Sequence, residues 1–262
     1  RYQLFFQFPA TTSRGVLYEK TSWFLVVKED GRIGIGECAP IQGLSIDNIE
    51  KIPVVLDELC TKLILGEKIN SADYVDFPSV MFAIETALLS VNSKNTFILF
   101  PSDFTSGEKG IKINGLIWAG EDDYIFSQIN NKVREGFNVI KMKIGYKEFE
   151  KELEILRQTR QTYPEIDIRL DANGGFTPDV ALNYLERLSE LNIHSIEQPI
   201  KPNQWDELKV ICKKSPIKIA LDEELIGIRD NKERERLLKE VKPSYIILKP
   251  TLIGGFTECE QW

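Results

Sequence analysis

The sequence has a single histidine, no paired cysteines and no long apolar run, and each absence removes a class of function. His194 is the only histidine among the 262 residues, so a Ser-His triad or a Cys-His pair would have to use it. It stands at the beginning of an apolar segment, and we interpret it as a structural residue there. Acid–base chemistry must then come from Lys, Asp, Glu or Tyr.

The four cysteines, Cys38, Cys60, Cys212 and Cys259, are far apart in the sequence. This spacing disfavours a zinc site, and we expect reduced thiols in a cytoplasmic protein. No apolar run is long enough to span a bilayer, and the first residues do not resemble a signal peptide. The net charge of −7 argues against binding to nucleic acid. The oligomeric state stays open.

Residues 1–105 have the pattern of a small α+β domain. Short alternating runs over residues 2–37 flank an "EDGR" hairpin signal at residues 29–32. Two helices are predicted after them, one over about 46–65 and one over "PSVMFAIETALLSVN" at 78–92. Ser79 is the expected N-terminal cap of the second helix.

Residues 106–262 alternate between apolar strands and amphipathic helices. The predicted strands are "KINGLIW", "VIKMKIG", "DIRLDAN", "SIEQP", "IKIALDEE" and "YIILKPT". Strict alternation predicts a parallel sheet with right-handed crossovers. No Gly-rich phosphate loop opens a helix, so we expect a TIM-like (β/α) barrel rather than a dinucleotide fold. A closed barrel has eight strands, so we expect further βα units beyond Trp262.

Charged residues at the ends of these strands recur once per βα unit. Successive intervals of 28, 26, 25 and 27 residues separate Lys143, Asp171, Glu197, Asp222 and Lys249. Each stands where its strand would leave the barrel, which is the end that holds the active site in this fold. Lys141 should face the same way as Lys143, because side chains in a strand alternate with a period of two.

Three carboxylates from neighbouring strands would repel one another unless a cation lay between them. Oxygen ligands favour a hard ion, so Asp171, Glu197 and Asp222 are predicted to bind Mg²⁺, with Mn²⁺ as an alternative. Lysines on either side suit removal of the proton next to a metal-bound carboxylate. Burial, the second ammonium group and the metal would each disfavour the charged form of Lys143 and so make it a better base.

These residues resemble those of the enolase superfamily. The "KMK" motif of Lys141 and Lys143 is similar to the K-x-K motif of its muconate-lactonizing subgroup, and the N-terminal part resembles its capping domain. "TSRGV" (12–16), "GECAPIQGLS" (36–45), "FPSVMFAIETALL" (77–89) and "INGLIW" (113–118) resemble the o-succinylbenzoate synthase family. The resemblance implies a dehydratase of menaquinone synthesis that acts on a small carboxylate.

The resemblance also implies roles for single residues. Lys143 would be the base that removes the α-proton, and Lys249 would be a cation over the opposite face of the substrate. Arg14, in the "TSRG" loop, is a candidate substrate contact, although it could equally be a surface residue. Arg169 and Asn173 share the face of Asp171 and are candidates to contact substrate or to support the carboxylates.

Three other functions remain open at this point. A dipeptide epimerase or N-acylamino-acid racemase could use the same lysines and carboxylates. A non-catalytic barrel would have no need of the full set of charges. A Schiff-base aldolase needs one buried lysine but has no use for three converging carboxylates.

Overall fold

The N-terminal part is built on an antiparallel sheet of three strands in the order β1–β2–β3. The computed structural model describes residues 1–12 and 15–262. The strands are β1 (Tyr2–Thr12), β2 (Gly15–Glu29) and β3 (Arg32–Cys38). Asp30 and Gly31 join β2 to β3 with positive φ angles of 48° and 78°, as a tight hairpin requires. The predicted "EDGR" hairpin is confirmed.

Two α-helices accompany this sheet, α1 (Ile52–Ile64) and α2 (Pro78–Asn92), with short 3₁₀ turns at Ile49–Lys51 and Ser71–Tyr74. Helix α2 packs directly on β3, where a Cβ added to Gly36 would lie 1.8 Å from the carbonyl oxygen of Ala83. The backbones therefore approach more closely than any side chain at residue 36 would permit.

Two details of the predicted helices were wrong. The first α-helix begins at Ile52, not near residue 46, because a 3₁₀ turn precedes it and Pro53 stands at its start. Ser79 is not the cap of α2, since Phe77 occupies that position. The Ser79 hydroxyl instead donates a hydrogen bond of 2.6 Å to Asp47 Oδ1, and the Ser79 backbone N–H donates to the same oxygen at 3.1 Å.

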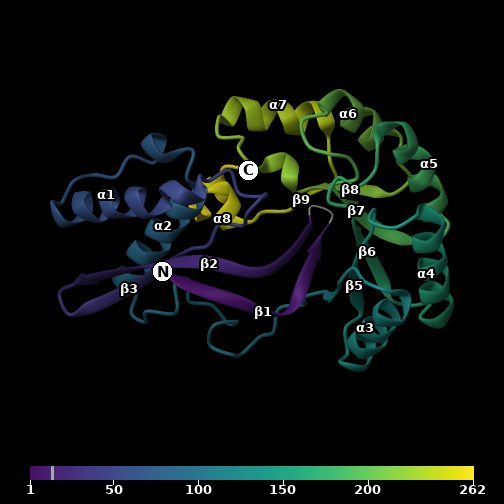
Figure 1. Ribbon diagram of the computed structural model, residues 1–262, viewed down its shortest axis with the longest axis horizontal. Helices are drawn as coiled ribbons and strands as arrows, with labels where there is room; N and C mark the ends of the chain where they lie inside the picture. The colour runs from purple at the N-terminus through teal and green to yellow at the C-terminus, as the bar shows by residue number, and fades with distance from the viewer. Residues whose placement is uncertain (13–14) are drawn as a thin grey trace.

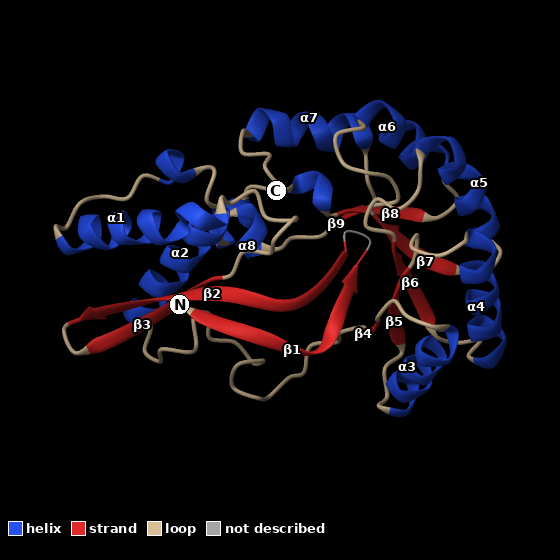
Figure 2. Cartoon of the chain, viewed as in Figure 1, coloured by secondary structure: helices blue, strands red, loops and turns tan. Residues whose placement is uncertain are grey.

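The second part contains a six-stranded parallel sheet in the order β4–β5–β6–β7–β8–β9. Figures 1 and 2 show this sheet beside the N-terminal part, with its helices arranged as an outer arc. The strands are β4 (Gly115–Ile117), β5 (Val139–Lys143), β6 (Asp167–Asp171), β7 (Ile193–Glu197), β8 (Lys218–Leu221) and β9 (Tyr245–Ile246). The main helices are α3 (Asp122–Arg134), α4 (Phe149–Thr162), α5 (Pro178–Ser189), α6 (Trp205–Lys214) and α7 (Asn231–Val241).

The strand–helix order is the one predicted, with one shortening at the end. The segment "YIILKPT" was expected to be a full strand, but β9 covers only Tyr245–Ile246 and helix α8 (Pro250–Ile253) follows it. Pro250 fixes a helical φ at the first position of α8, so the strand cannot continue through it. A second short helix, α9 (Phe256–Glu260), comes next.

Burial divides strand β5 into two faces. On β5, Ile140 and Met142 are fully buried in the core beneath the helices, whereas Lys141 and Lys143 are half-buried on the other face. The predicted common face of the two lysines is confirmed. The proposed boundary between residues 105 and 106 lies in a stretch, 93–114, that contains no named helix or strand, and it stays a prediction. None of the described helices is long and apolar enough to cross a membrane.

Candidate active site

Strand register brings the predicted charges to one end of the sheet. Lys143 pairs with Asp171 across β5 and β6, and Asp171 pairs with Glu197 across β6 and β7. Glu197 then pairs with Ala220 on β8, so Asp222 stands two residues further along. Lys249 follows β9 at the N-terminus of α8. The five positions therefore meet at the carboxyl ends of adjacent parallel strands.

The lysines and carboxylates alternate in direct contact. Lys141 Nζ donates to Glu197 Oε2 at 2.5 Å and lies 3.0 Å from Asp171 Oδ2. Lys143 Nζ donates to the same oxygen of Asp171 at 2.7 Å. Lys249 Nζ forms a close ion pair with Asp222 Oδ2 and lies 3.7 Å from Glu197 Oε1. Three ammonium groups thus balance three carboxylates.

The three carboxylates are almost completely buried, with exposed fractions of 2% for Asp171 and 5% for both Glu197 and Asp222. Burial opposes ionisation of Asp171, but the ammonium groups of Lys141 and Lys143 outweigh it and lower the pKa of this carboxyl. Burial, followed by the charge of Asp171, raises the pKa of Glu197 to about 7. The carboxylates of Asp171 and Glu197 outweigh burial at Lys141 and raise the pKa of its ammonium group.

The three carboxylates are a candidate site for a divalent cation. In residues 1–12 and 15–262, no three carboxylate, thiol or imidazole groups form a ready-made cage, because the lysines bridge the carboxylates. The donor set is nevertheless all oxygen, which suits Mg²⁺. Glu197 Oε1 is buried and accepts no hydrogen bond within the described part of the chain. This oxygen could therefore coordinate a metal ion without losing a hydrogen bond. The residues fit a hard cation if the ammonium groups move aside.

Buried polar side chains that were not predicted hold the loops behind these residues. Gln198 is completely buried, and its Oε1 accepts hydrogen bonds of 3.2 Å from the backbone N–H groups of Asp222 and Glu224. Glu224 in turn accepts from Gln198 Nε2, from Asn203 N–H and from Trp205 Nε1–H. In the sequence, they are marked only by their positions: Gln198 directly follows Glu197, and Glu224 stands two residues after Asp222.

The remaining sequence-predicted residues lie in different places. Arg14 is outside the described residues. Arg169 lines a cavity of about 340 Å³ with Lys141 and His194, and it donates a long hydrogen bond of 3.5 Å to Asn114 Oδ1. Asn173 lies within the site, since its Oδ1 accepts a hydrogen bond of 2.6 Å from Lys143 Nζ.

His194 has the structural environment expected from the sequence. It contacts Ser195 Oγ through Nδ1 at 2.9 Å and stacks on the ring of Tyr245. Burial, with a further contribution from Arg169, lowers the pKa of this imidazole.

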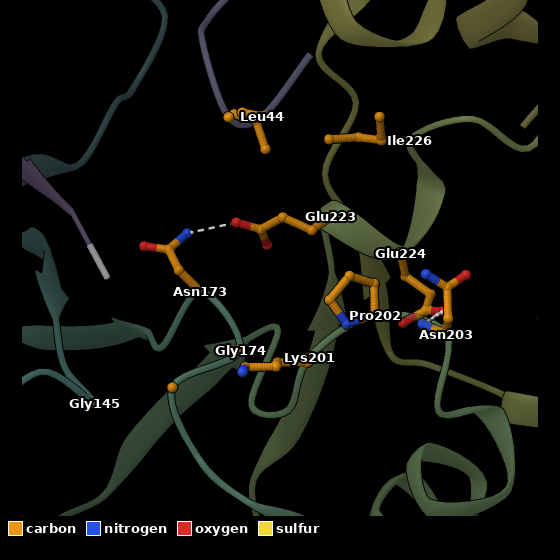
Figure 3. Close-up of a pocket in the computed structure, with 12 residues that line it drawn as sticks. Leu44, Gly145, Asn173, Gly174, Lys201, Pro202, Asn203, Glu223, Glu224 and Ile226 are labelled. Carbon is orange, nitrogen blue, oxygen red and sulfur yellow. Dashed lines mark hydrogen bonds between the residues drawn. The ribbon is translucent and has the colours of Figure 1, made fainter. Parts of the chain in front are cut away.

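A cavity of about 630 Å³ opens beside the site (Figure 3). Asn173 and Glu223 line it next to the carboxylates, and Leu44 and Ile226 lie across from them. Leu44 belongs to the N-terminal part, so both parts of the chain contribute to the walls. The cavity is large enough for a small organic acid.

Comparison with known proteins decides the family. Residues 126–262 match the family model described as enolase C-terminal domain-like, and residues 1–91 match the model described as MenC, N-terminal domain. An o-succinylbenzoate synthase from Desulfotalea psychrophila is 42% identical to the chain, over all of it and over 80% of that protein. The chain belongs to the o-succinylbenzoate synthase family of the enolase superfamily.

Solved structures agree with this family. The crystal structure of MenC from D. psychrophila LSv54 aligns with 99% of the chain and 81% of its own, at a TM-score of 0.84 and 38% identity. An o-succinylbenzoate synthase from Thermosynechococcus elongatus BP-1, described as complexed with Mg in the active site, aligns over 99% and 77% at a TM-score of 0.78 and 24% identity. At that identity the likeness supports the fold.

The family assignment confirms the predicted fold class, an enolase-type barrel with an N-terminal α+β part, and the predicted class of enzyme, a dehydratase of the lyases. The epimerase alternative has weaker support. An L-Ala-D/L-Glu epimerase from Francisella tularensis is 25% identical over 89% of the chain and 68% of that protein. Among o-succinylbenzoate synthases the identity rises to 42% over the whole chain.

Proposed function

We propose that the chain dehydrates 2-succinyl-6-hydroxy-2,4-cyclohexadiene-1-carboxylate to o-succinylbenzoate in menaquinone synthesis. The observation that carries the proposal is the arrangement of Lys143 and Lys249 on either side of three buried carboxylates. The likeness to the D. psychrophila synthase over the whole chain points to the same reaction. The free thiols support a cytoplasmic location.

Asp171, Glu197 and Asp222 are the proposed ligands of a divalent cation, Mg²⁺ or alternatively Mn²⁺. Once bound, this cation would hold the substrate carboxylate and offset the negative charge that develops when the α-proton leaves. Lys141 keeps two of the carboxylates in place, since its ammonium group contacts both Asp171 and Glu197.

Lys143 takes the α-proton and later gives it to the departing hydroxyl group. One C–H bond and one C–O bond break, the ring becomes aromatic, and the transferred proton leaves as part of water. No further proton donor is needed. Lys249 lies on the other side of the carboxylates, where its positive charge stabilises the enediolate electrostatically.

Substrate recognition beyond the carboxylates is assigned to residues around the 630 Å³ cavity. We keep Arg14 as a proposed contact of the succinyl carboxylate, because a guanidinium group binds a carboxylate through two parallel hydrogen bonds. Asn173, which lines this cavity, and Arg169, which lines the cavity of about 340 Å³ instead, are kept as proposed contacts or supports. Neither a nucleic acid nor a membrane has a role in this proposal.

The decisive assay follows the absorbance of the aromatic product. Wild-type protein should convert the cyclohexadiene substrate, lose activity with a chelator and recover it with Mg²⁺. Lys143→Ala should reduce kcat by about 10³-fold, the range of a general base, with the circular dichroism spectrum unchanged. Lys151→Ala, which removes an exposed lysine from α4, is the matched control and should behave as wild type.

A second function has one specific observation in its favour. Lysines face the carboxylates from both sides, and two bases on opposite sides are what an epimerase needs to remove and return a proton. If the protein epimerises dipeptides and leaves the cyclohexadiene unchanged, the dehydratase assignment is wrong. Activity that survives complete metal removal would contradict the carboxylate ligands instead.

A further inference from the structure

The ammonium group of Lys143 has a hydrogen-bond acceptor that is not one of the proposed metal ligands. Lys143 Nζ donates to Asp171 Oδ2 at 2.7 Å and to Asn173 Oδ1 at 2.6 Å. Asp171 is committed to the charge cluster through Lys141 as well. The amide of Asn173 is uncharged and is not a proposed metal ligand. It can therefore keep its hydrogen bond to Lys143 when a cation binds to the carboxylates.

The backbone around Asn173 is held tightly. Asn173 has a positive φ of 45°, a conformation that asparagine tolerates better than most residues, and its N–H donates to Asp171 Oδ1 at 3.2 Å. Gly174 N–H donates to the carbonyl oxygen of Gln198 at 2.7 Å. A Cβ added to Gly175 would lie 2.6 Å from the carbonyl oxygen of Gly145. The turn is thus wedged between the loops that follow β5 and β7.

The amide of Asn173 also has a fixed orientation. Its Nδ2 donates a hydrogen bond of 2.8 Å to Glu223 Oε1, as the dashed line in Figure 3 marks. An ionised carboxylate only accepts hydrogen bonds, so the NH₂ end of the amide must face Glu223 and the oxygen must face Lys143. A flipped amide would place its NH₂ group against an ammonium group and its oxygen against a carboxylate. Glu223 is itself only 7% exposed.

Orientation matters because a lysine base accepts a proton through a single lone pair. The neutral amine keeps two N–H bonds, and acceptors for them leave one tetrahedral direction for the lone pair. An amide that flipped would donate to this lone pair and block it. Holding a reacting group in its productive direction is one of the larger sources of catalysis.

We propose that Asn173 is a positioning residue for Lys143 and that Glu223 acts through Asn173 by setting the direction of its amide. The inference rests on the proposed role of Lys143 as base. It replaces the substrate-contact alternative for Asn173, because both ends of the amide side chain are used within the protein.

Kinetics separates positioning from substrate contact. Asn173→Ala should lower kcat about 10²-fold, within the range of a general base, and change KM less than about threefold. Glu223→Leu should lower kcat about tenfold. Glu223→Gln can accept from or donate to the Asn173 amide and so fixes its direction less strictly, and it should lose less activity than Glu223→Leu. Asn183→Ala removes an exposed asparagine of α5 and serves as the matched control.

The double variant Asn173→Ala/Glu223→Leu gives the sharpest result. If Glu223 affects turnover by setting the direction of the Asn173 amide, the double variant should have the kcat of Asn173→Ala alone, since no amide is left for Glu223 to orient. Multiplied effects would overturn the proposal and give Glu223 an independent role. A large rise in KM with unchanged kcat would overturn it in favour of substrate contact.

One readout does not depend on turnover. A neutron structure of Glu223→Leu, or a crystal structure at better than about 1.2 Å in which the amide nitrogen and oxygen are told apart, should show the Asn173 amide turned and the hydrogen bond between Lys143 Nζ and Asn173 Oδ1 lost. If this hydrogen bond persists unchanged, the orienting role of Glu223 is wrong even though Lys143 remains the base. If wild type fails to turn over the substrate, the proposed function fails, and the structure of Glu223→Leu still tests the positioning.

Discussion

Glu152 holds the loop directly after the strand that carries both lysines, and its removal gives a quantitative test of how the site is supported. This carboxylate is 2% exposed. It accepts hydrogen bonds from the backbone N–H groups of Gly145, Tyr146 and Lys147 at 2.9, 3.1 and 3.1 Å. Within the described residues, no other side chain accepts a hydrogen bond from these three groups. Glu152→Ala would leave all three donors without their partner.

The expected cost can be worked from these contacts. A hydrogen bond to a charged group contributes roughly 1.5–3 kcal/mol, so three of them represent a gross loss of about 4.5–9 kcal/mol. Residues 145–147 are half-buried, so water can replace part of the bonding. Burying a carboxylate is itself unfavourable, so removing it offsets a further part of the lost hydrogen-bond energy. We expect a net destabilisation of about 3 kcal/mol, or a fall in Tm of about 6–12 °C.

The assay compares Glu152→Ala with Glu154→Ala, which removes an exposed carboxylate of the same helix. Burial raises the pKa of Glu152, so the measurements belong at alkaline pH, which favours the ionised carboxyl. Tm from calorimetry should fall for Glu152→Ala alone, and kcat should fall about tenfold because the end of β5 loosens. A Tm within 2 °C of wild type would refute the hydrogen-bond argument. A lower Tm with normal kcat would refute the link to Lys143.

Two further predictions concern charge. Lys249→Met should tighten Mn²⁺ binding about tenfold in a calorimetric titration, because it removes the ammonium group that competes for Asp222 and Glu197. A contact of this kind at a partly exposed lysine is worth about 1–2 kcal/mol after screening. Weaker binding would show that the metal ion does not share these carboxylates. His194→Ala should leave kcat within about twofold of wild type and the dependence of kcat on pH between 6 and 8 unchanged. The reason is that the imidazole is packed against Tyr245 and burial lowers its pKa. If the variant loses a pH-dependent change in rate that wild type shows, His194 has a role in catalysis.

The barrel and its charges were predictable because both repeat with the βα unit. Lys143, Asp171 and Glu197 occupy equivalent strand ends, and parallel register turns equal spacing in the sequence into adjacency in space. The end of the sheet was less predictable. The apolar run after Tyr245 indicated a strand through Lys249, but Pro250 starts a helix and takes the run out of the sheet.

The supporting residues could not be predicted for a different reason. Glu152 and Glu224 look in the sequence like any solvated acidic residue, since amphipathic helices and strand ends are commonly charged. Their burial depends on which backbone N–H groups a neighbouring loop leaves without a partner, and loop conformation has no periodic signature. Ser79 shows the same limit, because its position at the start of a helical pattern suggested a cap, whereas its hydroxyl group donates a hydrogen bond to Asp47.

The loops at the active-site end are joined into a continuous series. Glu152 holds the loop after β5, the carbonyl oxygen of Gln198 accepts from Gly174 in the loop after β6, and Glu224 accepts from Asn203 in the loop after β7. Gln198 Oε1 completes the series by accepting from the first residues after β8. Each loop is therefore held by a group from an adjacent element in addition to any hydrogen bonds between its own residues. Buried polar networks of this kind are rigid when every member is bonded, so the spacing between Lys143 and Asp222 is set by four loops together and a change in one should reach the others.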